Sequence, residues 1–384
     1  MEQGPLSKKI VIFPNDSLQT YFDKGELTER YYNPMDIFQE VHVISLSDKE
    51  VSEDKVQVLA GAASLRIYAL GKPGILNLIN GSYQNRIDAL VSKIRPDIIR
   101  AYNSNLAGWL AVKAARKMGI PSVISLHADP ERDTRALINK LKEPKRWFIW
   151  NISKKVFEPY ALSGVDRVIC VYDFLLDYAR GHAGSSKVKL IYNRIDTDRF
   201  DNSRKAPDDE NRVPRILCVG RIMRQKNPEN IVKAVKDLDI KLTLIGNGEY
   251  ADRIERLIKG LGIENKVEFI KSVYYGQIHR FYKEADIFAS SNNYGGVSKT
   301  VMEAMSSGLP IVASKPILVD SPDLVGDAAL IVDNTPLGYK DAFQKLISDS
   351  RFRQDLGSRG RAKMLAIDGK KMEQQEKDLY QSLM

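Results

Sequence analysis

The sequence contains little cysteine and no long apolar segment. Its two cysteines, Cys170 and Cys218, both fall inside short apolar runs of a chain of 384 residues. Two cysteines cannot form a disulfide framework, and neither has a cysteine or histidine at the spacing of a zinc site, so we expect buried, reduced thiols. A membrane-spanning helix needs roughly 20 consecutive apolar residues, and no segment approaches that length. The first apolar run, at residues 10–13, is too short and too early to be the apolar region of a signal peptide, so we expect a cytoplasmic protein.

The charge balance is basic but does not identify a partner. The chain has 58 lysines and arginines against 49 acidic residues, a formal net charge of +9. Such a balance permits attraction to any anionic partner, whether nucleic acid, membrane surface or phosphate ligand. Since nucleic-acid binding would rest on total charge alone, we expect no nucleic-acid partner.

Two successive blocks of short apolar runs and longer helical patterns organise the chain. This alternation is typical of parallel sheets covered by helices on both faces. In the first block the predicted strands lie near residues 10–13, 41–45, 97–101, 122–126, 167–171 and 188–191. In the second they lie near 216–219, 241–245, 267–270, 286–289, 311–313 and 329–332. A polar, proline-containing stretch at 201–214 separates the blocks, so we predict an α/β protein of two doubly wound domains joined by a linker there.

A glycine-containing loop that leads into a helix is the most informative segment. The loop runs from Asn292 to Ser298, the helix carries Glu303 near its start, and Gly308-Leu309-Pro310 then opens an apolar strand. Backbone N–H groups of such a loop and the helix N-terminus form a positive cradle for phosphate, while a carboxylate one or two turns in can accept hydrogen bonds from a ribose diol. These features predict a nucleotide-sugar site. Ordinary turn chemistry is the alternative explanation of the loop.

Two cations follow an apolar strand earlier in the chain. The strand at 216–219 ends at Gly220, and Arg221 and Lys226 come next. Strands of open α/β sheets deliver side chains to the crevice at their carboxyl ends, so these cations are placed to bind a diphosphate. The alternative is a solvated basic loop.

These motifs, in this order and spacing, resemble the family 4 retaining glycosyltransferases of GT-B fold. In the C-terminal half the resemblance rests on Gly220-Arg221 with Lys226, on Leu244-Ile245-Gly246-Asn247-Gly248, and on Glu303-Ala304-Met305 with Gly308-Leu309-Pro310. In the N-terminal half it rests on residues 95–103, 120–129, 166–171 and 191–200. It implies two facing Rossmann-like domains with a cleft between them. The acceptor-binding domain would span 1–205 and the donor-binding domain 206–365, with the last helix, about 365–384, packing back on the first domain.

The resemblance also implies roles for individual residues. Arg221 and Lys226 would neutralise the leaving diphosphate, and His127, one residue past a predicted strand, would lie near the transferred sugar. The implied donor-binding residues are Gly220, Gly246, Val273, Tyr274, Gly295, Gly296, Val297, Ser298, Lys299, Thr300 and Glu303. A structural histidine is the alternative role of His127. Asn15 and Asp129 are candidates for contacts with the acceptor, and a solvated loop is the alternative for Asp129.

One position departs from the family pattern. A second glutamate usually lies eight positions before the one that matches Glu303, and this sequence has Gly295 there. By the resemblance, that glutamate contacts the transferred sugar. A protein that binds nucleotide sugars with little or no transferase activity is therefore an alternative function.

The expected activity is transfer of a sugar from a nucleotide diphosphate sugar, with UDP or GDP as the nucleotide, to a hydroxyl acceptor. The resemblance implies retention of configuration and a place in the synthesis of polysaccharide, glycolipid or another cell-surface glycan. Because two cations already serve the diphosphate, we expect no metal and no cofactor. A sugar-nucleotide epimerase, the other alternative, would need an acid/base pair facing the sugar, and the sequence shows no convincing pair of carboxylates.

The segment Lys140–Phe157 gathers lysines and an arginine around two tryptophans and two phenylalanines. Trp147, Trp150 and Lys154 recur at helical spacing, as in a helix that lies on an anionic lipid surface. Such a helix would place the protein peripherally on the inner face of the membrane and would suit a lipid-linked acceptor. The alternative is an amphipathic helix packed on its own domain.

Overall fold

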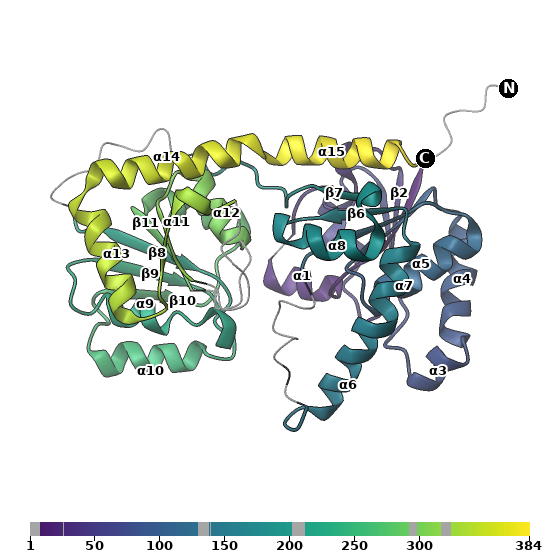
Figure 1. The fold of residues 1–384 in the computed structure, drawn as a ribbon, viewed down its shortest axis with the longest axis horizontal. Helices are drawn as coiled ribbons and strands as arrows, with labels where there is room; N and C mark the ends of the chain where they lie inside the picture. The colour runs from purple at the N-terminus through teal and green to yellow at the C-terminus, as the bar shows by residue number, and fades with distance from the viewer. Residues whose placement is uncertain are drawn as a thin grey trace. The chain divides into compact units, whose positions relative to one another are not determined.

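The computed structural model describes residues 8–25, 27–129, 138, 140–201, 212–291, 298–315 and 324–384. The chain divides into two compact units (Figure 1). The described residues up to Tyr192, together with Lys371–Met384, form the N-terminal unit. The described residues of Asn193–Lys370 form the C-terminal unit. The predicted linker at 201–214 falls largely outside the described residues.

The N-terminal unit is built on a seven-stranded sheet in which every pairing is parallel. In spatial order its strands are β3 (Ser64–Ala69), β2 (Glu40–Ser45), β1 (Lys9–Phe13), β4 (Ile98–Tyr102), β5 (Ser122–Leu126), β6 (Arg167–Cys170) and β7 (Val188–Leu190). Successive residues Ile10 to Phe13 of β1 are all fully buried, so both faces of the sheet are covered. The sequence analysis missed β3, an edge strand whose buried and exposed positions are mixed.

Helices connect these strands, and residues next to the helix ends cap them. They are α1 (Leu18–Lys24), α2 (Glu53–Val56), α3 (Ile75–Ile79), α4 (Ser82–Ile94), α5 (Leu106–Met118), α6 (Pro144–Ile152), α7 (Glu158–Gly164), α8 (Leu176–Ala183) and, at the end of the chain, α15 (Gly369–Gln381). The helix α5 is an example of local control: the Asn105 side chain accepts the Ala107 N–H, and Gly119 ends the helix in the left-handed conformation. A π-helical turn at Ser153–Phe157 joins α6 to α7.

The C-terminal unit is built on a six-stranded parallel sheet. Its spatial order is β10 (Val267–Ile270), β9 (Lys241–Ile245), β8 (Arg215–Val219), β11 (Ile287–Ser290), β12 (Ile311–Ser314) and β13 (Ala329–Val332). All six lie where the sequence predicts them. The helices are α9 (Glu229–Ala234), α10 (Ala251–Leu261), α11 (Ile278–Glu284), α12 (Lys299–Ser306), α13 (Pro336–Ser348) and α14 (Ser350–Ala366).

Each sheet reverses its strand order once, between β1 and β4 in one unit and between β8 and β11 in the other. Open α/β sheets bind ligands at the carboxyl ends of the strands beside such a reversal. The two parallel sheets, each with one reversal of strand order, confirm the predicted architecture of two doubly wound domains. The loops after these four strands are the first places to look for a functional site.

Three further predictions concern the thiols, the membrane and the tail. Cys170 and Cys218 are buried free thiols, and burial raises the pKa of each to about 12, so both stay protonated. No helix in the described part of the chain is both long and apolar enough to span a membrane. The tail is helical, with α14 followed by α15 at the yellow end of the chain (Figure 1). Residues from Lys371 onward belong to the N-terminal unit.

Candidate functional site

A small pocket in the C-terminal unit lies at the reversal point of its sheet. Gly220, Arg221 and Lys226, which follow β8, line one side, and Ser298 and Thr300, at the start of α12, line another. Its volume is about 20 Å³, which has room for a water-sized group rather than a whole nucleotide. The pocket therefore brings together the two motifs that the sequence places more than seventy residues apart.

Arg221 and Lys226 lie on the loop after β8, and backbone hydrogen bonds join this loop to the loop after β9. The Ile222 N–H donates to the Asn247 carbonyl over 2.9 Å, and the Gly220 N–H donates to the Ile245 carbonyl over 3.0 Å. Arg221 is exposed, and Lys226, in a short 3-10 turn at Arg224–Lys226, is half-buried. These bonds hold the loop after β8 against the loop after β9.

Two glycines permit this close approach. A Cβ on Gly246 would lie 1.9 Å from the Gly220 carbonyl oxygen, and one on Gly248 would lie 2.4 Å from the Ile222 carbonyl oxygen. Their φ angles are +153° and +150°, which side chains other than glycine rarely adopt. The sequence analysis assigns Gly246 to donor binding. The structure also gives Gly246 a packing role that shapes the loop carrying Arg221.

The start of α12 supplies the second side of the pocket. The Ser298 side chain caps the helix by accepting the Val301 N–H, and its hydroxyl lies 2.9 Å from the Thr300 hydroxyl. Because the positive end of the helix dipole lies in this first turn, it favours an anion there. The predicted donor residues Gly295, Gly296 and Val297 lie outside the described residues.

Glu303, in the second turn of α12, is buried between two tyrosines. Its exposed fraction is 2%, and the Tyr282 hydroxyl donates to Oε2 over 2.9 Å. Burial raises the pKa of Glu303, while nearby Lys299 and the hydrogen bonds from Tyr282 and Tyr275 act in the opposite direction. A carboxylate can accept about four hydrogen bonds, so Glu303 retains capacity for a ligand hydroxyl.

Sequence reasoning missed Tyr275, the residue after the predicted base-binding Tyr274. Two cations make cation–π contacts with the Tyr275 ring. The Lys299 ammonium lies 4.2 Å from the ring centroid, and the Arg199 guanidinium lies 4.8 Å from it. Arg199 also donates to the Tyr275 carbonyl over 2.8 Å. Tyr274 itself is 73% exposed and Val273 is half-buried. The sequence signal was a pair of adjacent tyrosines, and only the register of the turn Tyr275–Gln277 decides which one faces Glu303.

The predicted residues of the N-terminal unit gather at the carboxyl ends of β1, β4 and β5. The His127 N–H donates to the Asn103 side-chain oxygen over 3.2 Å, and the Asn103 amide donates to the Asn15 side chain. Asn103 has a φ of +92°, an uncommon backbone conformation for any residue but glycine. The sequence analysis named Asn15 and His127 but missed Asn103, which connects them. Asp129 is buried, with 4% of its surface exposed, so the solvated-loop alternative is wrong for its side chain.

The His127 ring stacks on Tyr102, with ring centroids 5.7 Å apart and planes at 30°. Its Nε2 atom is buried and has no hydrogen-bond partner within the described part of the chain. Burial lowers the pKa of His127 to about 4, and the nearby Arg100 cation acts in the same direction. The imidazole is therefore neutral at neutral pH, and one ring nitrogen lacks a protein partner among the described residues.

No three described His, Cys, Asp or Glu side chains are grouped as a metal site would require. The charged groups that line the described C-terminal pocket are the cations Arg221 and Lys226. The pocket is therefore suited to bind an anion. The buried carboxylate of Glu303 lies one turn further along α12.

Solved structures with the same architecture include a glycosyltransferase and a protein in complex with UDP and glucose. A glycosyltransferase from Rickettsia africae superposes with a TM-score of 0.73 at 15% identity, covering 98% of this chain and 99% of that one. Anabaena HepE in complex with UDP and glucose superposes with a TM-score of 0.71 at 16% identity, covering 97% and 99%. The fold is thus the GT-B fold of glycosyltransferases.

Sequence comparison places the chain within this class. Residues 199–363 match the model of glycosyl transferases group 1, and residues 39–199 match the model of glycosyltransferase family 4. The two models together span residues 39–363, and the chain belongs to the family 4 glycosyltransferases. An uncharacterized glycosyltransferase of Methanocaldococcus jannaschii is 22% identical over 84% of each chain. The alpha-monoglucosyldiacylglycerol synthase of Streptococcus pneumoniae is 22% identical over 56% of this chain and 51% of its own length.

Proposed function

We propose that this protein is a retaining, metal-independent glycosyltransferase that moves a sugar from a UDP- or GDP-sugar to a hydroxyl acceptor. The observation that carries the proposal is the meeting of Arg221, Lys226 and the start of α12 around one pocket, with Glu303 buried in the next turn. Cleavage of a nucleotide sugar pushes negative charge onto the leaving diphosphate, and preorganised cations and a helix N-terminus stabilise that charge.

The donor assignment draws on the same residues. Glu303 would accept hydrogen bonds from the ribose hydroxyls, and the exposed Tyr274 ring would stack on the base. Anabaena HepE, which shares the fold, has been solved with UDP and with UDP-glucose. A mannosyltransferase of Mycolicibacterium smegmatis, 24% identical over 48% of this chain and 53% of its own length, is named as GDP-mannose-dependent. Both nucleotides therefore remain in the proposal.

The chemistry proposed for the sugar is a front-face displacement assisted by the leaving phosphate. Arg221 and Lys226 supply the charge neutralisation that a divalent cation provides in other transferases, which is the reason for proposing metal independence. The neutral His127 imidazole would donate a hydrogen bond to a hydroxyl of the transferred sugar, and Asn15 and Asp129 would bind the acceptor. In this assignment residues 1–205 form the acceptor-binding domain and residues 206–365 the donor-binding domain.

A thermal-shift screen with donor hydrolysis tests this function. UDP, GDP and their sugar conjugates are compared with and without EDTA, and hydrolysis is measured for each nucleotide that raises the melting temperature. We expect one nucleotide family to stabilise the protein, with the shift and the hydrolysis unchanged by EDTA. A shift without hydrolysis or transfer would support the binding-only alternative, and no shift with any nucleotide would overturn the assignment of the pocket.

We further propose an anionic membrane surface as a partner, with a lipid-linked acceptor and a peripheral cytoplasmic location. No described side chain of α6 is buried, and Leu141, Phe148 and Ile149 are 91%, 58% and 66% exposed. Lysines lie over the two tryptophans: Lys140 is 4.9 Å from the Trp147 ring and Lys154 is 5.6 Å from the Trp150 ring. This arrangement, apolar side chains with cations beside them, suits an anionic headgroup layer.

A second apolar surface in the same unit supports this partner. Ile75, Leu76 and Ile79 of α3 are 74%, 77% and 78% exposed. Figure 1 draws α3 and α6 both at the lower end of the N-terminal unit. Relatives include the pneumococcal alpha-monoglucosyldiacylglycerol synthase and the mycobacterial phosphatidylinositol monomannoside mannosyltransferase named above. Membrane proximity would bring a glycolipid acceptor to the enzyme.

Vesicle sedimentation tests the membrane proposal. The protein should sediment with vesicles containing phosphatidylglycerol and not with pure phosphatidylcholine, and sedimentation should weaken with added salt. Charge reversal to glutamate at Lys145, Arg146, Lys154 and Lys155 should abolish it. The matched control reverses four exposed cations of the C-terminal unit, Lys236, Arg256, Lys259 and Lys283. Equal loss in both variants, or no sedimentation of the unmodified protein, would contradict the proposal.

A further inference from the structure

A buried arginine lies beneath the proposed acceptor side of the N-terminal unit. Arg100 is on β4, and its side chain is 5% exposed. It forms an ion pair with Glu376 of α15, whose side chain is 7% exposed. The guanidinium also donates to the Ser125 hydroxyl over 2.8 Å and to the Tyr380 hydroxyl. A cation this deeply buried stays charged only because a carboxylate and further hydrogen-bond acceptors surround it.

Arg100 and His127 contact the same aromatic ring. The guanidinium carbon of Arg100 is 4.3 Å from the centroid of Tyr102, and Tyr102 stacks on the His127 imidazole. The Tyr102 hydroxyl donates to the Tyr31 carbonyl over 3.1 Å, which restrains the ring from its other end. Any shift of Arg100 therefore changes the ring on which His127 rests.

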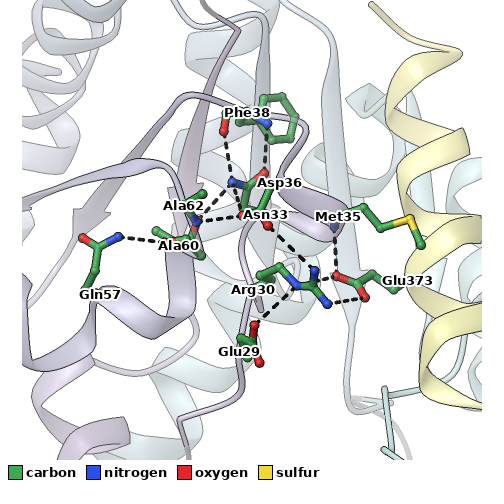
Figure 2. A network of polar contacts seen from close by, with 11 residues as sticks. Glu29, Arg30, Asn33, Met35, Asp36, Phe38, Gln57, Ala60, Ala62 and Glu373 are labelled. Atoms are coloured by element: carbon green, nitrogen blue, oxygen red, sulfur yellow. Dashed lines mark hydrogen bonds and ion pairs between the residues drawn. The ribbon is translucent and has the colours of Figure 1, made fainter.

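A second carboxylate one turn earlier in α15 makes a comparable ion pair elsewhere. Glu373 contacts the Arg30 guanidinium at 3.3 Å and accepts the Met35 N–H over 2.9 Å, as Figure 2 shows. The Glu373 and Glu376 side chains are 6% and 7% exposed, so each carries a buried charge within the N-terminal unit. Burial and the Arg100 cation lower the pKa of His127, and the Glu376 carboxylate acts in the opposite direction.

We propose that Arg100 and Glu376 are positioning residues for His127, holding Tyr102 against the imidazole and setting the electrostatic field at the ring. The proposal rests on the proposed function, in which His127 binds a hydroxyl of the transferred sugar. Among the described residues, the Tyr102 ring of β4 stacks on the imidazole, and Arg100 of β4 and Glu376 of α15 act on it electrostatically. Through Glu376, the helix α15 thus contributes to the site. Glu376 lies 249 residues after His127 in the sequence.

The direction of the effect follows from the charges. The Arg100 cation disfavours a second positive charge on the imidazole, and Glu376 partly offsets Arg100. Neutralising Glu376 alone leaves Arg100 uncompensated and pushes protonation of His127 to lower pH. Removing both charges takes away the larger effect, that of Arg100, and moves protonation to higher pH.

The test is an NMR titration of the histidine ring protons, with the His127 signal assigned by its loss in His127→Asn. In the double variant Arg100→Met/Glu376→Leu, which replaces the pair with apolar side chains, the titration midpoint of His127 should rise by at least about half a pH unit. In the matched control Arg30→Met/Glu373→Leu, which removes the other ion pair of α15, it should not move. An unchanged midpoint in the first variant, or an equal shift in the control, would overturn the proposal.

If the double variant does not fold, a second variant tests the proposal. Glu376→Gln keeps the shape and a hydrogen-bond acceptor for Arg100, and the His127 midpoint should then fall. An unchanged or higher midpoint would contradict the proposal. If donor hydrolysis is measurable, the acid limb of its pH profile should move with the NMR midpoint in the Arg100 and Glu376 variants and stay fixed in the control.

The titration separates this inference from the proposed function. It needs neither donor nor acceptor, so a failed titration overturns the positioning role and leaves nucleotide binding intact. A failed nucleotide screen overturns the proposed function and leaves the effect of Arg100 and Glu376 on the imidazole intact.

Discussion

The Tyr282 hydroxyl, on α11, donates a hydrogen bond to the Glu303 carboxylate, on α12, over 2.9 Å, and both side chains are buried. A carboxylate removed from water needs such donors, because desolvation otherwise drives it towards its protonated form. The bond fixes the orientation of the acid that the proposed function assigns to the ribose. It also links the stability of the C-terminal unit to that site.

Tyr282→Phe should destabilise the protein by about 1.5 to 3 kcal/mol at pH 7.5, the range for a hydrogen bond to a charged group. The pKa of Glu303 is already raised in the folded state by burial, and losing this donor raises it further. A carboxylate with a raised folded pKa costs stability in full above that pKa, and the cost declines as the pH falls through the folded pKa towards the unfolded value. The loss should therefore shrink as the pH falls towards 5. Urea denaturation at the two pH values measures this. The half-buried Tyr250, changed to Phe as a control, should cost less than about 0.5 kcal/mol, and equal losses at the two sites would contradict the argument.

Arg221→Ala and Lys226→Ala should each cost about 2 to 4 kcal/mol of transition-state stabilisation, which corresponds to roughly 30- to 1,000-fold in kcat/KM. The reason is the loss of a cation beside the leaving diphosphate. Donor hydrolysis or transfer gives the measurement. Arg224→Ala, an exposed cation of the same loop, is the matched control and should have little effect. Near-wild-type turnover in both Arg221→Ala and Lys226→Ala would contradict the assignment of these two cations to the leaving diphosphate.

Gly246→Ala should destabilise the C-terminal unit by about 1 to 3 kcal/mol, because the new Cβ would meet the Gly220 carbonyl and the backbone conformation disfavours alanine. It should also weaken nucleotide binding, since the displaced loop carries Arg221. Gly260→Ala is the control: Gly260 lies in α10, a Cβ added there would have nothing within 4 Å, and alanine should stabilise by about 0.5 to 1 kcal/mol. Thermal denaturation of the two variants gives the comparison, and a stable Gly246→Ala protein would refute the packing role.

His127 should make stability depend on pH in a definable window. Its pKa is lowered to about 4 in the folded protein from an unfolded value of about 6.5, so its contribution is complete above pH 6.5 and is lost as the pH falls towards 4. Between pH 7.5 and 5 the wild-type protein should lose about 1 to 2 kcal/mol more stability than His127→Asn. The same substitution at His182, on α8, is the control. The prediction fails if the wild-type protein and His127→Asn lose stability in parallel over this range.

The strand pattern shows how far local sequence predicts this fold. Parallel strands buried on both faces are continuous apolar runs, and this local signal located every strand of the C-terminal sheet. The edge strand β3 has a mixed pattern and was missed, because an edge receives less cover and needs less apolar sequence. The motif containing Arg221 and Lys226 and the helix with Glu303 were also predicted, since ligand-binding residues of such sheets follow strand ends in a regular order.

By itself, the sequence determined the two-sheet architecture, the family and the two motifs that meet at the C-terminal pocket, which carry Arg221 and Lys226 and the start of α12. Each of these depends on local periodicity or on motifs within a short stretch of chain. Only the tertiary structure decided that Tyr282 and Tyr275 hold Glu303, that Asn103 connects Asn15 with His127, and that Glu376 pairs with Arg100. These pairings join separate elements, in the last case across 276 residues. The packing and register of distant elements set them, and such distances between side chains leave no periodic signal in the chain.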